Sequence, residues 1–160
     1  MLFRSPEPLG TLRITPASAD VVKHGLPPLE SMELMVPTEG WDGFRFQGFK
    51  IEEIVEGGRI ALGASCRTPA NKERNLPGLV LNRLASAGFQ LAVRDFGKTQ
   101  LWGILPLYMT KRLKVVGIDV IAAPNVLPRQ DKAELFQKYD RYWLKNNPRF
   151  CKVIVGENSN

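Results

Sequence analysis

The sequence is poor in the side chains that most often carry catalysis or bind metals. It contains one histidine, His24, and two cysteines, Cys66 and Cys151. Cysteines this far apart form neither a disulfide framework nor a zinc knuckle, and one histidine leaves a zinc or two-metal centre short of ligands. We expect two free, buried thiols in a reducing compartment and an exposed His24. No metal site and no cofactor are predicted.

Long apolar runs are also missing. The longest, residues 101–109 and 115–124, fall short of the roughly 20 apolar residues that a membrane-spanning helix needs. The N-terminal sequence Met-Leu-Phe-Arg-Ser-Pro-Glu-Pro contains no apolar core of a signal peptide. We therefore expect a cytoplasmic protein that does not cross a membrane.

Positive charge is present in excess, and it is unevenly placed. Residues 1–64 carry six basic and nine acidic side chains, whereas residues 65–160 carry sixteen basic and seven acidic ones. Within residues 65–115, nine basic side chains stand against Glu73 and Asp95 alone. Clustered like charges predict a surface that attracts polyanions. A solvated basic face that serves solubility is the alternative.

The first forty residues are rich in proline, with six of the twelve prolines of the chain. We interpret residues 1–40 as an arm without helix or strand, followed by one domain at 41–156 and a tail at 157–160. The arm carries one apolar cluster, which either packs on the core of the domain or binds a protein partner. Its candidate partner-binding residues are Leu29, Met32, Leu34 and Met35.

The remaining sequence predicts alternating strands and helices. Helices are expected from Pro77 to Gly88 and over residues 128–145, where apolar positions recur at helical spacing. Gly57-Gly58 is typical of a tight hairpin turn. Strands are expected at residues 44–56, 59–66, 90–94, 100–108, 113–121 and 150–155.

These elements indicate an α+β fold, with a mixed or antiparallel sheet and two helices. From Arg59 onward their order is that of a ferredoxin-like split βαβ core with one extra strand, preceded by the β-hairpin and the arm. The aromatic-rich segment 41–50 is interpreted as part of the core.

One segment satisfies a relaxed phosphate-loop pattern, at residues 92–99, which end in Lys98 and Thr99. The sequence that follows is strand-like rather than helical, and Val93 and Phe96 replace the small residues that such a loop needs. We interpret the segment as a hairpin turn with Arg94 and Lys98 at its tip. An enzyme that binds a nucleoside triphosphate is the less favoured alternative.

Acid–base and nucleophilic catalysis find little support. The carboxylates Glu52, Glu53 and Glu56 fall within one predicted hairpin, where solvated positions are the default. A cysteine nucleophile would need His24 to fold over the domain. The sequence therefore favours a protein that is not an enzyme.

The leading hypothesis is a non-enzymatic nucleic-acid-binding accessory domain that reads single strands or the phosphate backbone. Loops and strand starts carry its cations outward, where they can contact phosphates. The alternative is a structural or adaptor subunit of a larger assembly, with the N-terminal arm as its docking segment. The candidate phosphate contacts are Arg67, Lys72, Arg74, Arg94, Lys98, Lys111, Arg112 and Lys114.

Overall fold

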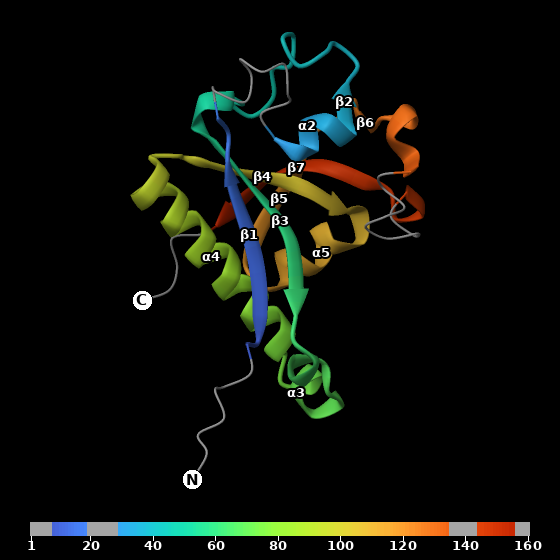
Figure 1. The fold of residues 1–160 in the computed structure, drawn as a ribbon. Coiled ribbons are helices and arrows are strands. Elements are labelled where there is room, and N and C mark those ends of the chain that lie inside the picture. Colours follow the sequence, from blue (N-terminus) through green and yellow to red (C-terminus); the bar gives the residue numbers. More distant parts are fainter. Residues whose placement is uncertain (1–7, 19–28, 135–143, 156–160) are drawn as a thin grey trace.

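A five-stranded mixed sheet forms the centre of the molecule (Figure 1). The structure is a computed structural model of the 160-residue chain, and it describes residues 8–18, 29–134 and 144–155. Strands β3 and β4 run parallel, whereas the other neighbouring strands are antiparallel, which confirms the α+β class. In spatial order the strands are β1 (Gly10–Pro16), β3 (Ile54–Leu62), β4 (Gln100–Pro106), β7 (Pro148–Val155) and β5 (Ile118–Ala122).

Helices α4 (Leu76–Phe96) and α5 (Leu107–Val115) cover one face of the sheet. On that face, Val55 and Leu101 of the sheet pack with Ala92 of α4. Short helix α3 (Pro69–Glu73) precedes α4. Short 3-10 turns occupy Ile51–Glu53, Ala64–Arg67, Gln130–Lys132 and Leu144–Asn146.

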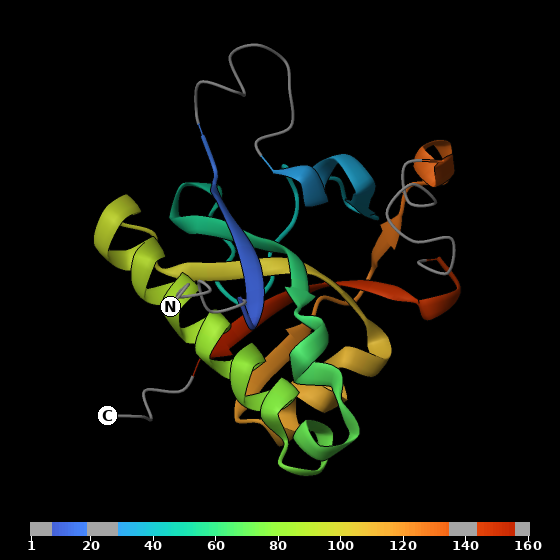
Figure 2. The same cartoon turned by 60° about the horizontal axis from the view of Figure 1, so that its bottom comes forward.

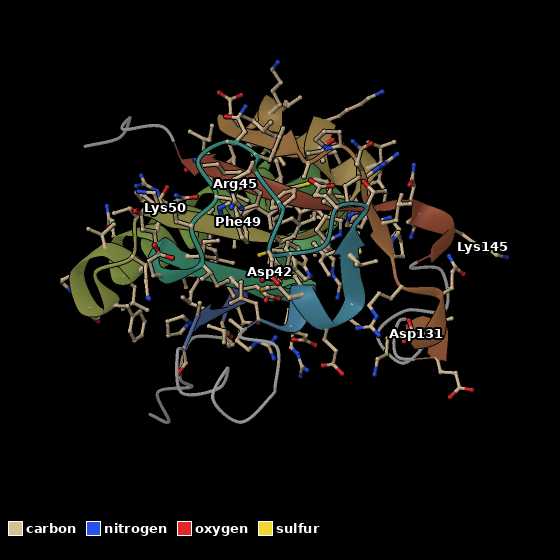
Figure 3. The ribbon with its side chains drawn as sticks, turned by 90° about the horizontal axis from the view of Figure 1, so that it is seen from above. Asp42, Arg45, Phe49, Lys50, Asp131 and Lys145 are labelled. Carbon is tan, nitrogen blue, oxygen red and sulfur yellow. The ribbon has the colours of Figure 1, made fainter. Side chains whose placement is uncertain are left out.

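The opposite face is covered by α2 (Glu30–Leu34), by the loop at residues 38–50, and by the two-stranded pair of β2 (Met35–Pro37) and β6 (Val126–Pro128). Its core is aromatic: the rings of Trp102 and Phe150 stack with centroids 4.9 Å apart. Viewed from the side of the loop, Phe49 lies over the middle of the sheet (Figure 3). The interpretation of residues 41–50 as core is thus confirmed.

The apolar cluster of the predicted arm belongs to this core. Leu29, Leu34 and Met35 are buried, with at most 5% of each residue exposed, and Met32 packs against them. Of the two alternatives for this cluster, the structure therefore agrees with packing on the chain's own core. Met32 is only partly buried, and the binding of a protein partner through these residues stays a prediction.

The first predicted helix begins as expected but is longer. Pro77 lies in its first turn, yet α4 continues through Gly88 to Phe96 and ends at Gly97, which has a φ of 61°. Gly88 is buried where α4 packs against β1. A Cβ at this position would lie 2.9 Å or less from the side chains of Leu12 and Ile14, so that this close contact needs a glycine. The predictions of a strand at 90–94 and of a hairpin turn at 95–99 are therefore wrong.

The predicted hairpin at Gly57-Gly58 is also wrong. Both glycines lie inside one continuous strand, β3, whose antiparallel partner is β1 rather than residues 44–56. Residues 44–50 form a loop instead of a strand, and β1 and α2 contradict the expectation that the first forty residues contain neither strand nor helix. The sequence predicted that this strand pairs with the segment next to it, whereas its actual partner, β1, comes from much earlier in the chain.

Later in the chain the predictions succeed in part. The strands expected at 100–108 and 150–155 are confirmed as β4 and β7, although residues 107–108 belong to α5. Of the strand expected at 113–121, residues 113–115 also belong to α5, whereas residues 118–121 lie in β5. Residues 126–132 form β6 and a 3-10 turn rather than the start of the helix at 128–145. Residues 133–134 are helical as expected, whereas residues 135–143 of that helix lie outside the described residues, as do His24 and the tail.

A ferredoxin-like core is not confirmed. In a split βαβ unit another strand separates the two parallel strands, whereas β3 and β4 are direct neighbours here. The domain bounds at residues 40 and 156 stay a prediction.

Candidate ligand cleft and basic end

A cleft opens between the two parallel strands. The pairing of β3 with β4 runs from Ile54 and Gln100 to Glu56 and Trp102, and ends there. Beyond this point a cavity of about 470 Å³ lies between the strands. Its walls are Arg13, Glu30, Leu34, Glu56, residues 57–61, residues 104–106 and Met109. We call it the β3–β4 cleft.

Gly103 marks the point where the strands begin to diverge. A Cβ at this position would lie 2.5 Å from the carbonyl oxygen of Gly57, so that only glycine lets β4 pass this close to β3. On their outer sides β3 pairs with β1 and β4 pairs with β7. The inner edges of both strands therefore face the cleft, at the carboxyl ends of parallel strands, where α/β sheets commonly bind ligands.

Glu56 brings a carboxyl group into the wall of this cleft. The residue is 5% exposed, and its Oε2 accepts hydrogen bonds from the Ser31 backbone N–H and the Ser31 hydroxyl, each 3.1 Å long. Burial raises the pKa of Glu56 above its usual value, and neighbouring Glu30 adds to this, whereas Ser31 and Arg13 lower it. A carboxyl group with a raised pKa in a cavity is a candidate for proton transfer.

Two arginines and a second carboxylate complete the charged wall. Arg13 stands opposite Gly58 in the strand pairing and forms an ion pair with Glu30, and Arg59 Nη2 lies 3.5 Å from Glu30 Oε1. Within the part of the chain that the structure describes, Arg13 Nε is buried and has no hydrogen-bond acceptor. Charges of alternating sign thus run from Arg59 through Glu30 and Arg13 to Glu56.

The backbone at Arg59 is strained. This residue has a φ of 51°, a left-handed conformation that costs energy for any residue except glycine. Two glycines, Gly57 and Gly58, directly precede it. Such strain persists where the surrounding structure holds it, and it clusters at ligand sites.

Six of the eight predicted phosphate contacts gather at one end of the molecule, which we call the basic end. The segment after β3 contributes three of them and α5 contributes the others, and all six side chains are exposed. Figures 1 and 2 show α3 beyond the C-terminal end of β3. The end of α5 lies near the first half of α4, where Asn82 donates a hydrogen bond to the carbonyl oxygen of Val116. The six are Arg67, Lys72, Arg74, Lys111, Arg112 and Lys114.

Arg94 and Lys98 do not belong to this group. They lie at the opposite end of α4, whose 21 residues span about 30 Å. Arg94 pairs with Asp95 at 2.6 Å, and Lys98 Nζ donates to the carbonyl oxygen of Glu52 at 2.7 Å. Because residues 92–99 end a helix instead of preceding one, they lack the strand–loop–helix order of a phosphate loop.

The three carboxylates that the sequence placed in one solvated hairpin have different surroundings. Glu52 is exposed, and Glu53 accepts hydrogen bonds from Gln100 and Thr99. The Gln100 hydrogen bond and Lys50 lower the pKa of Glu53. For Glu56 the expectation of a solvated position is wrong, because β1 and α2 cover it. The available signal was slight, since Glu56 only follows the apolar pair Ile54-Val55 and directly precedes Gly57-Gly58.

Both cysteines are buried, free thiols, as predicted. Burial raises the pKa of Cys151 to about 12, so that a reactive thiolate is disfavoured there. Among the described residues, no group of three His, Cys, Asp or Glu side chains is arranged to hold a metal ion. None of the helices described here combines the length and apolar character needed to cross a membrane.

Comparison with known proteins adds no relative. No protein-family profile, no curated protein and no solved structure matches this chain at a significant level.

Proposed function

We propose that this protein is an acyltransferase that binds a phosphate-bearing carrier of the coenzyme A type in the β3–β4 cleft. The observation that carries the proposal is the cleft itself, with the buried Glu56 carboxyl in its wall. A cavity that combines apolar walls with a few convergent polar groups is the usual form of a small-molecule site. The proposal departs from the sequence-based expectation of a protein that is not an enzyme.

The strand edges favour an extended ligand with amide groups. Pairing between β3 and β4 stops at Glu56 and Trp102, and the backbones of residues 57–61 and 104–106 line the cavity beyond. An extended chain adds to exposed strand edges through main-chain hydrogen bonds, and its own amide groups supply the partners.

The basic end favours phosphate groups on the same ligand. Lys111 and Arg112 lie two and three residues after Met109, which lines the cleft, and the Arg67–Arg74 segment leads into the first turn of α4. That turn contains no acidic residue, and helix N-termini attract anions. Coenzyme A and phosphopantetheine join phosphates to a chain with two amides, and they carry acyl groups as thioesters.

Glu56 is assigned to proton transfer in the reaction. Its carboxylate takes a proton from an acceptor ammonium group, and the neutral amine nitrogen forms a bond to the thioester carbonyl carbon. The C–S bond then breaks, and the thiolate leaves with the second amine proton. The products are an amide, a free thiol and one proton on Glu56, which returns to solvent. A raised pKa brings a carboxylate closer to the working pH of such a base.

We expect coenzyme A to bind at least about tenfold more tightly than either of its halves, pantetheine or 3′-phosphoadenosine 5′-phosphate. Each half loses a set of contacts, and 1.4 kcal/mol corresponds to a factor of ten in affinity. Isothermal titration calorimetry at one fixed salt concentration measures all three affinities. Equal affinity for coenzyme A and the phosphate half would mean that only surface charge is bound, and would contradict a ligand in the cleft.

A second candidate is the nucleic-acid binding that the sequence predicts. It is favoured by the six exposed cations of the basic end, among which Glu73 is the single acidic side chain of residues 65–75 and 107–117. Tyr108, 48% exposed, lies under the guanidinium of Arg112 at 5.4 Å and offers a ring for a base to stack on. The same basic end therefore serves either proposal, and the two differ in whether the cleft takes part.

A further inference from the structure

The outer side of α5 combines apolar and basic side chains. Val115 is 83% exposed, and Leu107 and Tyr108 are 42% and 48% exposed. Three exposed cations share this half of the helix, because at 3.6 residues per turn all six positions lie on the side opposite the buried Leu113. The three cations are Lys111, Arg112 and Lys114. We call these six residues the α5 face.

The α5 face offers more than a ligand of the coenzyme A type can use. Phosphates pair with its cations, but neither phosphates nor a polar pantetheine chain cover a valine that is 83% exposed. A single exposed apolar side chain is ordinary, whereas several gathered among cations are typical of a protein interaction site. The face also adjoins the cleft, because Pro106 and Met109, at the start of α5, both line it.

Resting on the proposed function, we propose that the acyl group is delivered by a small acidic protein, which carries phosphopantetheine on a serine and docks on the α5 face. Its carboxylates pair with the three cations of the face, and its apolar side chains cover Val115. Met109 and Val115 are six residues apart, about 9 Å along the helix axis. The arm of a protein seated on the face therefore starts close to the cleft, where its thioester reaches Glu56.

The charge of the α5 face favours this occupant over two others. Residues 107–117 contain no acidic side chain, so that a second copy of this chain would bring two sets of cations together. A nucleic acid satisfies the cations through its phosphates, but its backbone leaves Leu107 and Val115 in water. The surface of an acidic protein offers carboxylates and apolar side chains together.

The size of the face suits a carrier that leaves after each transfer. α5 has nine residues and spans about 13 Å, and a contact centred on one such helix belongs with the small interfaces of transient complexes. Opposite charges speed the association of the two proteins, and a small interface lets them separate again.

The test compares two probes that share the same arm: 4′-phosphopantetheine, and a purified acidic acyl carrier protein that bears this group on its serine. We expect calorimetry to show that the carrier protein binds at least about tenfold more tightly, because it alone contacts the α5 face. In Val115→Gln its affinity should fall about tenfold, the usual effect of losing a buried valine. The substitution keeps the net charge, so that the affinities for 4′-phosphopantetheine and coenzyme A stay unchanged.

Val93→Gln is the matched control, because Val93 is 46% exposed near the far end of α4, and this variant should bind both probes as the wild type does. A carrier protein that binds no more tightly than 4′-phosphopantetheine, or equally well to Val115→Gln, overturns the docking. So does a single-stranded RNA that binds more tightly than the carrier protein and loses affinity in Val115→Gln. If 4′-phosphopantetheine and coenzyme A themselves fail to bind, the proposed function fails instead.

Discussion

Glu56→Gln is expected to lower the rate of acyl transfer by about 10²- to 10⁴-fold, the usual contribution of a positioned general base. Glutamine keeps the shape of the side chain, and its oxygen can still accept both hydrogen bonds from Ser31. Affinity for coenzyme A should therefore change little. The measurement is thiol release from acetyl-CoA with a primary amine as acceptor. Glu52→Gln, which changes an exposed carboxylate nearby, is the control and should retain the wild-type rate.

The same variant should be more stable than the wild type at neutral pH but not in acid. Below the usual carboxyl pKa of 4.5, Glu56 is protonated in both folded and unfolded chains, and the two proteins should unfold alike. As the pH rises, the unfolded chain loses this proton first, because burial raises the pKa of Glu56 in the folded state. The wild type then loses stability relative to the Glu56→Gln variant, until the pH exceeds the pKa of Glu56 in the folded state.

Thermal unfolding between pH 4 and pH 8 measures this difference. Each tenfold difference in proton affinity between the folded and unfolded states corresponds to about 1.4 kcal/mol, and 1 kcal/mol shifts Tm by about 2–4 °C in a chain of this size. A Tm difference that stays constant over this range would contradict a raised pKa at Glu56. That result would remove the main chemical argument for proton transfer.

Removal of three cations from the basic end is expected to weaken coenzyme A binding by about 10- to 100-fold at low salt. The variant is Arg67→Ala/Lys72→Ala/Arg74→Ala, and its effect should shrink as salt rises, because exposed charges are screened over about 10 Å at 0.1 M. Affinity for pantetheine, which carries no phosphate, should be unchanged. Calorimetry at two salt concentrations measures both ligands.

Arg94→Ala/Lys98→Ala is the matched control, because it removes two cations at the far end of α4. Its affinity for coenzyme A should remain that of the wild type. Single-stranded DNA and RNA, titrated in parallel, distinguish the two candidate functions. If these polymers bind much more tightly than coenzyme A, and the affinity falls steeply with salt, the basic end is a nucleic-acid site. Equal weakening by both variants would show that net charge alone drives binding.

Local sequence signals predicted those parts of the fold that depend on local structure. The first turn of α4 is marked by Pro77, and β4 and β7 by their apolar runs. Gly88 led to a wrong prediction of the end of the helix, because glycine commonly follows a helix end, whereas this glycine lies inside α4. Here its missing side chain lets α4 approach Leu12 and Ile14, a contact with a strand more than seventy residues earlier.

The candidate site was harder to predict, because its properties arise from distant segments. Glu56 is buried by α2 and hydrogen-bonded by Ser31, 25 residues earlier in the chain, and β1 brings Arg13 beside it. A hairpin at Gly57-Gly58 would have left the same carboxylate in solvent. The six cations of the basic end were found from charge density alone, whereas their separation from Arg94 and Lys98 depends on the true length of α4.

The most direct test of a ligand in the β3–β4 cleft is to follow backbone amide signals by NMR during titration with coenzyme A. The account predicts shifts on both inner strand edges, at residues 57–61 and 103–106, together with shifts at residues 67–74. Pantetheine alone should shift the strand residues and leave residues 67–74 unchanged. Shifts confined to the basic end, with the residues of the two strands unaffected, would contradict binding in the cleft.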